Sequence, residues 1–197
     1  MTLLPRGMAF IDFPNITSGG GAYGNIRLNF AGLAKVLTDG TRPVGVMAYI
    51  VDIGSRQGLF RQMSRSGLKP EPVSPGKSVD GRLIFDLIVG AQRDMYDICI
   101  LASGDRDYVP VVQEAKRLMK QVWVASFSSS IAPSLKACAD KFIDLDQHIK
   151  EILLTRKLFP ANCADCGAPF QLPFQPITGK PVYCPACLPK HRKPQRP

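Results

Sequence analysis

Apolar and polar positions alternate along the chain in blocks that are typical of strands and helices. Short apolar, β-branched runs cover 8–11, 44–51, 98–102 and 122–127, with a weaker run at 68–73. Between them, apolar residues recur with helical spacing over 27–37, 55–63, 79–91 and 108–119. Strands that alternate with helices require right-handed crossovers and a parallel sheet covered on both faces. The pattern therefore predicts an α/β fold with a doubly wound, mostly parallel sheet.

Two segments interrupt this pattern. A glycine-rich stretch, 18–24, is expected to form a loop after the first strand. After Leu154 the helical spacing stops, and Pro, Cys and Gly dominate the rest of the chain. A chain of 197 residues is long enough for one α/β domain and a small appendage. We therefore expect two domains, residues 1–155 and residues 156–197.

Four of the six cysteines form two C-x-x-C pairs in the second domain: Cys163 with Cys166, and Cys184 with Cys187. Two such pairs separated by 17 residues are typical of a tetrahedral Zn²⁺ site. Four protein ligands leave no open position, so the predicted zinc is structural and the module is a zinc ribbon. Its two short strands are expected between the pairs. The competing interpretation, a redox site, needs only one pair and a thioredoxin-like context.

Acidic residues follow the predicted strands at the end where open parallel sheets bind ligands. Asp12 ends the first strand, and Asp105 follows the strand at 98–102. Their side chains can approach each other if the two strands are neighbours in the sheet. A third contribution comes from the helix predicted at 79–91. The acidic candidates at this edge are Asp12, Asp80, Asp105 and Asp107, with Asp86 in reserve.

Several carboxylates that converge on one edge cannot all stay ionised without a cation. Mg²⁺ and Mn²⁺ take oxygen ligands, and such ions can activate water and position a phosphodiester for in-line displacement. A catalytic triad is a poor alternative, because the chain has only two histidines. For Asp80 and Asp107 the competing interpretation is a helix N-cap, and for Asp86 it is a solvent-facing position.

The net charge of +9 favours polyanionic partners, of which nucleic acid is the simplest. From residue 155 onward the chain has seven basic residues and one acid, so this segment carries most of the charge. A solvated basic tail is the competing interpretation. No apolar run reaches the ~18 residues of a membrane span, and the N-terminus lacks the apolar region of a signal peptide. We therefore expect a cytoplasmic protein without disulfides.

Three short motifs contain the acids named above: IDFPN at 11–15, KSVDGRLIFDLI at 77–88 and SGDRDYVP at 103–110. They resemble the motifs of the NYN domain family, a branch of the PIN-like fold. IDFPN resembles the family's opening ID-x-x-N motif, and KSVDGRLIFDLI is similar to its K-x-VD-x-x-L-x-x-D helix. SGDRDYVP resembles the SGD-x-D-[FY]-x-P segment, the most specific of the three. The resemblance covers residues 8–147 and implies a PIN-like sheet, a divalent-metal site and ribonuclease activity.

The resemblance also implies roles for individual residues. Asn15, expected in the loop after the first strand, would orient Asp12 or the substrate. The chain departs from the family where Phe13 follows Asp12, a position at which many relatives have Gly, so the substrate entrance is expected to differ. The residues implied to hold Mg²⁺ or Mn²⁺ are Asp12, Asp80, Asp105 and Asp107, and the candidate substrate-binding residues are Ser103, Lys77 and Arg106.

Together these features predict a metal-dependent ribonuclease whose zinc ribbon helps to bind RNA or a protein partner. The alternative is a catalytically inactive nucleic-acid-binding or adaptor protein with the same fold. A phosphatase that acts on a small substrate would leave the basic ribbon unexplained. The choice of RNA over DNA comes from the family resemblance, because charge alone does not distinguish the two.

Overall fold

The computed structural model describes residues 3–20, 27–154, 159–172, 175–177 and 179–191. The chain divides into two compact units, residues 1–154 and residues 155–197, and each is described by itself. None of the described helices is long and apolar enough to cross a membrane.

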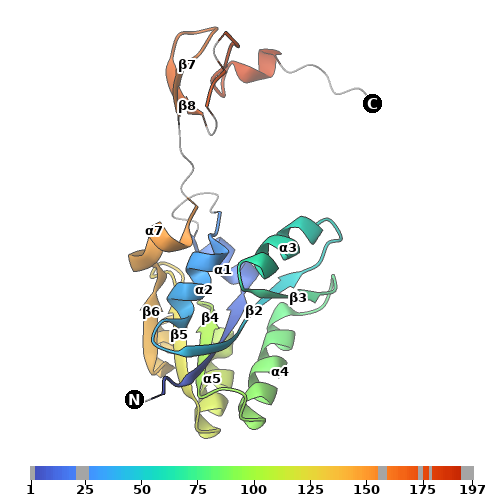
Figure 1. Ribbon diagram of the computed structural model, residues 1–197, viewed down its shortest axis with the longest axis vertical. Helices are drawn as coiled ribbons and strands as arrows, with labels where there is room; N and C mark the ends of the chain where they lie inside the picture. Colours follow the sequence, from blue (N-terminus) through green and yellow to red (C-terminus); the bar gives the residue numbers. More distant parts are fainter. Residues whose placement is uncertain (1–2, 21–26, 155–158, 173–174, 178, 192–197) are drawn as a thin grey trace. The chain divides into compact units, whose positions relative to one another are not determined.

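The first unit is built on a six-stranded sheet in which all neighbouring strands run parallel (Figure 1). The strand order is β3-β2-β1-β4-β5-β6, so the chain starts in the middle and winds outwards to both edges. This order confirms the predicted doubly wound parallel sheet. The strands are β1 (Arg6–Asp12), β2 (Arg42–Val51), β3 (Lys69–Val73), β4 (Ile98–Ala102), β5 (Gln121–Ser126) and β6 (Lys141–Asp144).

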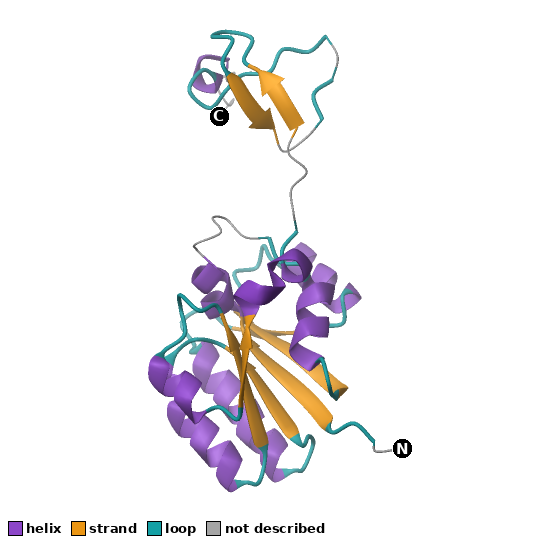
Figure 2. Ribbon diagram, turned by 90° about the vertical axis from the view of Figure 1, so that its left-hand side faces the viewer, coloured by secondary structure: helices purple, strands orange, loops and turns teal. Residues whose placement is uncertain are grey.

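Helices cover both faces of this sheet and create two apolar cores (Figure 2). Alternate side chains of β1 enter opposite cores: Ile11 packs into one and Phe10 into the other. The first face is covered by α1 (Phe13–Gly19), α2 (Phe30–Thr38), α3 (Gln57–Arg65) and α7 (Ile149–Ile152). The second face is covered by α4 (Val79–Gln92), α5 (Val109–Arg117) and α6 (Pro133–Cys138).

The largest difference from the sequence-based expectation follows β1. A loop was expected there, but the chain turns directly into α1, and Asn15 lies inside this helix. The Asp12 carboxylate accepts the backbone N–H of Asn15 and caps the helix, and Pro14 suits its first turn. Of the predicted loop at 18–24, residues 21–24 lie outside the described residues. The predicted helix at 27–37 begins later, at Phe30, because Asn29 caps it.

The second unit contains a two-stranded antiparallel hairpin of β7 (Phe159–Asn162) and β8 (Pro169–Leu172). This hairpin encloses the first cysteine pair, and a 3₁₀ turn, η4 (Leu188–His191), follows the second pair. The expectation that both strands lie between the pairs was therefore wrong, because β7 precedes Cys163. The hairpin has its turn at the C-x-x-C knuckle itself, where Gly167 adopts a positive φ of 71°.

Candidate functional site

The sheet brings the two central acidic segments together. β1 and β4 are neighbours, and their register pairs Ile11 with Ala102, the last residue of β4. The next residues, Asp12 and Ser103, therefore lie at the same edge. The strand order reverses between β1 and β4, which is where doubly wound sheets bind their ligands.

Asp12 is the most enclosed acid of this edge, with 4% of its surface exposed. One carboxylate oxygen accepts the Asn15 N–H at 3.1 Å. The other accepts the hydroxyl of Ser103 at 3.3 Å and that of Tyr108 at 3.2 Å. Burial raises the pKa of Asp12, and the nearby charge of Asp80 acts in the same direction, whereas the hydrogen bonds oppose both. The carboxylate is thus held in place and disposed to bind a cation.

Tyr108 joins two of the predicted acids, although no role for this residue was predicted from the sequence. Its hydroxyl lies 2.9 Å from a carboxylate oxygen of Asp80 as well as 3.2 Å from Asp12. Its side chain is buried, and burial together with the Asp12 charge raises the pKa of Tyr108, so the phenol stays neutral. The only signal in the sequence is its place in the SGDRDY motif.

The Ser103–Asp105 turn is held by hydrogen bonds from both sides. Asn15 accepts the Gly104 N–H through its side-chain oxygen at 2.9 Å, and the Ser103 hydroxyl accepts the Asp105 N–H at 3.2 Å. Asp105 in turn caps the 3₁₀ turn η2 (Arg106–Tyr108) by accepting the N–H of Asp107 at 3.0 Å. A side chain at Gly104 would overlap the carbonyl of Ser130. Only glycine therefore lets the turn pack this closely.

The remaining predicted residues are more exposed. The side chains of Arg106 and Asp107 are 82% and 80% exposed, with 3.9 Å between their charged atoms. Lys77 is exposed in the loop before α4. Asp86 has other partners: it accepts the hydroxyl of Tyr49 at 3.1 Å and pairs with Arg82 at 2.9 Å. The contacts thus connect the side chains of Asp12, Asn15, Asp80, Ser103 and Asp105. They reach Asp107 only through its backbone N–H, and they leave Asp86 outside this group.

The carboxylate oxygens at this edge suit a divalent cation that keeps part of its water shell. Among the described residues, only the four cysteines bring three or more ligand atoms within 4.8 Å of one another. The acids are therefore spaced too widely to enclose a bare ion. Mg²⁺ usually keeps several waters and binds through one or two carboxylates together with substrate phosphates, and Asp12 and Asp80 suit that mode.

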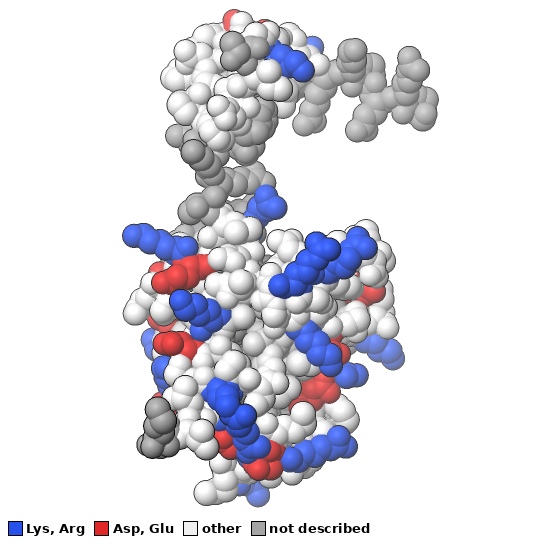
Figure 3. Space-filling view, viewed as in Figure 1, with Lys and Arg blue, Asp and Glu red and all other residues white. Residues whose placement is uncertain are grey.

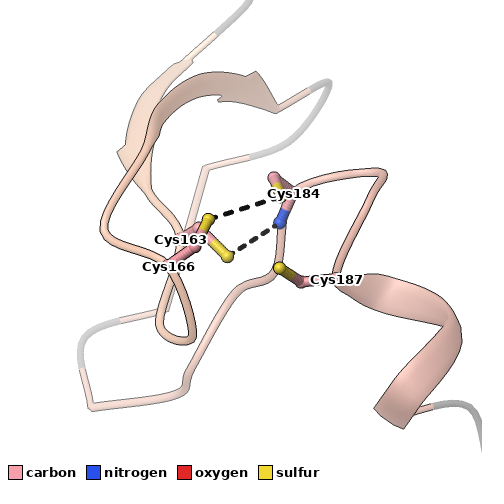
Figure 4. Close-up of side chains that lie close together, drawn as sticks. All are labelled: Cys163, Cys166, Cys184 and Cys187. Atoms are coloured by element: carbon pink, nitrogen blue, oxygen red, sulfur yellow. Dashed lines mark hydrogen bonds between the residues drawn. The ribbon is translucent and has the colours of Figure 1, made fainter.

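The cysteines of the second unit form a compact group (Figure 4). The sulfurs of Cys166 and Cys184 are 3.8 Å apart, and the Cys184 N–H points at the sulfur of Cys163 from 3.3 Å. This and neighbouring backbone N–H groups lower the pKa of Cys163 to about 6. The contact with Cys184 raises the pKa of Cys187 to about 12. Four soft sulfur ligands in this arrangement fit Zn²⁺.

Comparison with known proteins agrees with this division of the chain. A model of the NYN domain matches residues 6–146, and a model described as a probable treble clef zinc finger matches residues 156–192. The treble clef describes the module more closely than the ribbon expected from the cysteine spacing. No curated protein matches the chain in sequence.

One solved structure, that of a protein of unknown function from Vibrio parahaemolyticus, is similar to this chain with a TM-score of 0.65. The two sequences are 22% identical, and the match covers 78% of this chain and 99% of the Vibrio chain. At this identity the match supports the fold alone. The NYN model, by contrast, covers more than half of the chain and includes the whole aspartate edge. The protein therefore belongs to the NYN domain family, with a C-terminal treble clef zinc finger.

Proposed function

We propose that the protein is a metal-dependent ribonuclease that hydrolyses phosphodiester bonds at the aspartate edge. The observation that carries this proposal is the hydroxyl of Tyr108 between Asp12 and Asp80, with Asp105 on the adjoining turn. NYN domains belong to a nuclease superfamily, and this chain retains an acid at each position that its motifs mark.

Mg²⁺ or Mn²⁺ would be held by Asp12 and Asp80, with Asp105 and Asp107 binding its water ligands. When bound, the ion would polarise the phosphate and lower the pKa of a water molecule. The protein's own part is positional. Asn15 and Ser103 hold the turn that carries Asp105. Lys77, in the loop before α4, and Arg106, next to Asp105 in the chain, are exposed and would contact substrate phosphates.

The zinc finger would bind structural Zn²⁺ through its four cysteines and add a second contact for RNA or for a protein partner. Its described surface includes the exposed residues Lys180 and Lys190. Thiolates that hold zinc need reducing conditions, so we place the protein in the cytoplasm.

A direct test is the cleavage of labelled single-stranded RNA by the full chain with Mn²⁺, with Mg²⁺ and with excess EDTA. The Asp12→Asn variant is the matched control, because Asn keeps the shape of the side chain and can still cap α1. Cleavage that needs the metal and is lost in the variant would support the proposal. A DNA strand of the same sequence decides between the two nucleic acids.

Tight, salt-sensitive RNA binding without cleavage by either protein would contradict the ribonuclease proposal. It would instead support the alternative function, a nucleic-acid-binding protein that has kept the fold of a nuclease.

A further inference from the structure

A cavity of about 250 Å³ lies between α1, the helix that begins directly after Asp12, and α3, on the first face of the sheet. Phe13 lines it and directly follows Asp12, so the two Cα atoms are only ~3.8 Å apart. The cavity is smaller than the ~300–1,000 Å³ that takes drug-sized ligands, which suits one planar ring system. The residues that line this α1–α3 cavity include Phe13, Thr17, Arg27, Leu59 and Gln62.

The lining has the chemistry of a nucleobase site. Phe13 offers an aromatic ring, which packs at a tilt against Phe30 with 6.1 Å between the ring centres and is thus held in place. The exposed amide of Gln62 offers both donors and an acceptor to the edge of a base. None of the described lining residues is acidic. Stacking on an aromatic ring together with amide hydrogen bonds is how proteins hold unpaired bases.

The arginines beside the cavity are available for phosphates. Arg61 and Arg65 are exposed one turn apart on α3, which contains no acid, and Figure 3 shows basic side chains gathered over this helix. Neither they nor Arg27 takes part in an ion pair within the described part of the chain. On the opposite face of the sheet, Arg82 and Arg117 are paired with acids.

We propose that the α1–α3 cavity binds one unstacked base of a single-stranded RNA whose neighbouring phosphates lie on Arg27, Arg61 and Arg65. The strand would run from this surface to the aspartate edge, so the inference rests on the proposed function and names the path of its substrate. Only an unpaired strand fits, because bases inside a duplex cannot turn into a cavity.

The test is equilibrium binding of a labelled single-stranded RNA to the full chain in EDTA, which excludes cleavage. The double variant Arg61→Glu/Arg65→Glu is expected to weaken binding by at least about tenfold and to reduce the log–log salt slope by about 1.4, or about 0.7 for each lost phosphate contact with a single strand. The control, Arg42→Glu/Arg93→Glu, changes the net charge equally with two exposed arginines away from α3, and its affinity should stay within about twofold of the wild type.

Equal weakening by both variants, or an unchanged salt slope, would overturn the inference. Light-induced cross-linking of a thiouridine-labelled strand adds an independent measurement, and adducts confined to the zinc finger would also overturn it. The measurement needs neither metal nor turnover. A protein that binds RNA through α3 without cleaving it would therefore contradict the proposed ribonuclease while supporting the α1–α3 cavity.

A second inference concerns Tyr108, and a different observation carries it. One hydroxyl oxygen lies within hydrogen-bond distance of both Asp12 and Asp80, which belong to β1 and α4. The ring is 1% exposed and packs in the core between the sheet and α4, α5 and α6. The position of this hydroxyl is therefore determined by the fold, and it sets the spacing of the two carboxylates.

We infer that Tyr108 is a positioning residue, whose hydroxyl holds the carboxylates of Asp12 and Asp80 on either side of it, so that both would be available to hold a divalent ion. This inference also rests on the proposed function. In the Tyr108→Phe variant the ring and its packing remain and only the hydroxyl is lost. The carboxylates would then be free to separate, and the affinity for the ion would fall.

Mn²⁺ binding to the full chain without RNA, measured by the paramagnetic resonance of the free ion, tests this role apart from activity. Tyr108→Phe should raise the dissociation constant for Mn²⁺ by about tenfold, the effect expected from loss of an orienting group. Tyr96→Phe is the matched control, because it removes another buried hydroxyl. This hydroxyl donates to the carbonyl of Leu87 over 2.6 Å and is not part of the aspartate edge. Its Mn²⁺ affinity should equal that of the wild type.

Unchanged affinity in Tyr108→Phe, or the same loss in both variants, would overturn the positioning role. A wild-type protein that binds no Mn²⁺ would contradict the metal site itself and with it the proposed function.

Discussion

The two candidate metal sites of this protein are built in opposite ways. At the aspartate edge, the protein itself holds the central side chains in place: Asp12 is buried and receives three hydrogen bonds, and Tyr108 lies in a large apolar core. In the zinc finger, the core consists of three of the cysteines with Phe170 and Tyr183 packed against them. In this unit the candidate zinc ligands themselves make up most of the buried core.

This difference predicts which part of the molecule needs its ion in order to fold. We expect a sheet with two apolar cores to fold without a metal, so that an ion at the proposed site would add chemistry to a domain that is already folded. A module of this size buries too little apolar surface, so the free energy of metal binding becomes its free energy of folding. Loss of a cysteine ligand should therefore unfold the zinc finger, whereas loss of an aspartate ligand should abolish the activity of the NYN domain and leave it folded.

The largest effect is expected from Cys184→Ser in the zinc finger. Zinc contributes about 10–16 kcal/mol to the folding of such modules, so loss of one of four thiolates should leave the finger unfolded. We expect the zinc content of the purified protein to fall and protease cleavage to increase after residue 155, while the unfolding temperature of the NYN domain stays the same.

Cys138→Ser is the matched control for this prediction. Cys138 lies in the first unit, and its thiol donates to the carbonyl of Leu135, a bond that a serine hydroxyl can also make. This variant should keep all its zinc. A full zinc complement in Cys184→Ser would show that the cysteine group is not the zinc site.

At the aspartate edge, Asp105→Asn should abolish cleavage without unfolding the protein. Asn is as good an N-cap as Asp, so the bond from the Asp107 N–H to residue 105 is expected to remain. Loss of a charge at a metal-dependent site should lower kcat by about 10²-fold or more, and the unfolding temperature should stay within a few degrees. Unchanged turnover would remove Asp105 from the site.

Much of the fold could be predicted because the sheet is buried on both faces. The apolar run at 98–102 coincides with β4, and the strand order confirms the doubly wound sheet. Short elements could not be predicted in this way. α6 and β6 have six and four residues, too few to show a helical or strand period. α1 was missed because Pro14 and the following glycines are typical of loops, whereas Asp12 caps a helix there.

Site residues that directly follow a predicted strand could be predicted from the sequence. Site residues whose role comes from contacts between distant segments could not. Asp12 and Asp105 became candidates because they stand at or just after the ends of β1 and β4. Tyr108 follows the pattern of a core aromatic residue, and the partners of its hydroxyl are 28 and 96 residues away in the sequence. No local spacing reveals such a bridge.

A smaller effect is expected on the pH dependence of stability without metal. The pKa of Asp12 is raised in the folded protein, so the folded state binds this proton more tightly than the unfolded chain. As the pH rises from 3.8, the ordinary pKa of an aspartate, through the raised pKa of Asp12, the wild type should lose free energy of unfolding relative to Asp12→Asn. The change in the free energy of unfolding with pH is measured for both proteins by urea unfolding in EDTA.

Added Mn²⁺ should reverse this loss, because the ion binds the ionised carboxylate and stabilises the folded state. The difference in free energy of unfolding between the wild type and Asp12→Asn should therefore change with pH. A constant difference, or a gain in wild-type stability as the pH rises, would show that burial does not raise the pKa of Asp12.

The smallest effect is expected from Asp86→Asn, which tests where the aspartate edge stops. In the family motif this acid stands in the same helix as Asp80, and sequence alone left it in reserve. The structure gives it two other partners, the hydroxyl of Tyr49 and the guanidinium of Arg82. Asn can still accept from Tyr49, and an ion pair with a half-exposed arginine contributes less than about 1 kcal/mol. Cleavage and Mn²⁺ affinity should therefore match the wild type, whereas Asp80→Asn loses both. A loss of Mn²⁺ affinity in Asp86→Asn as large as that in Asp80→Asn would extend the site along α4, and the hydroxyl of Tyr108 would no longer mark its boundary.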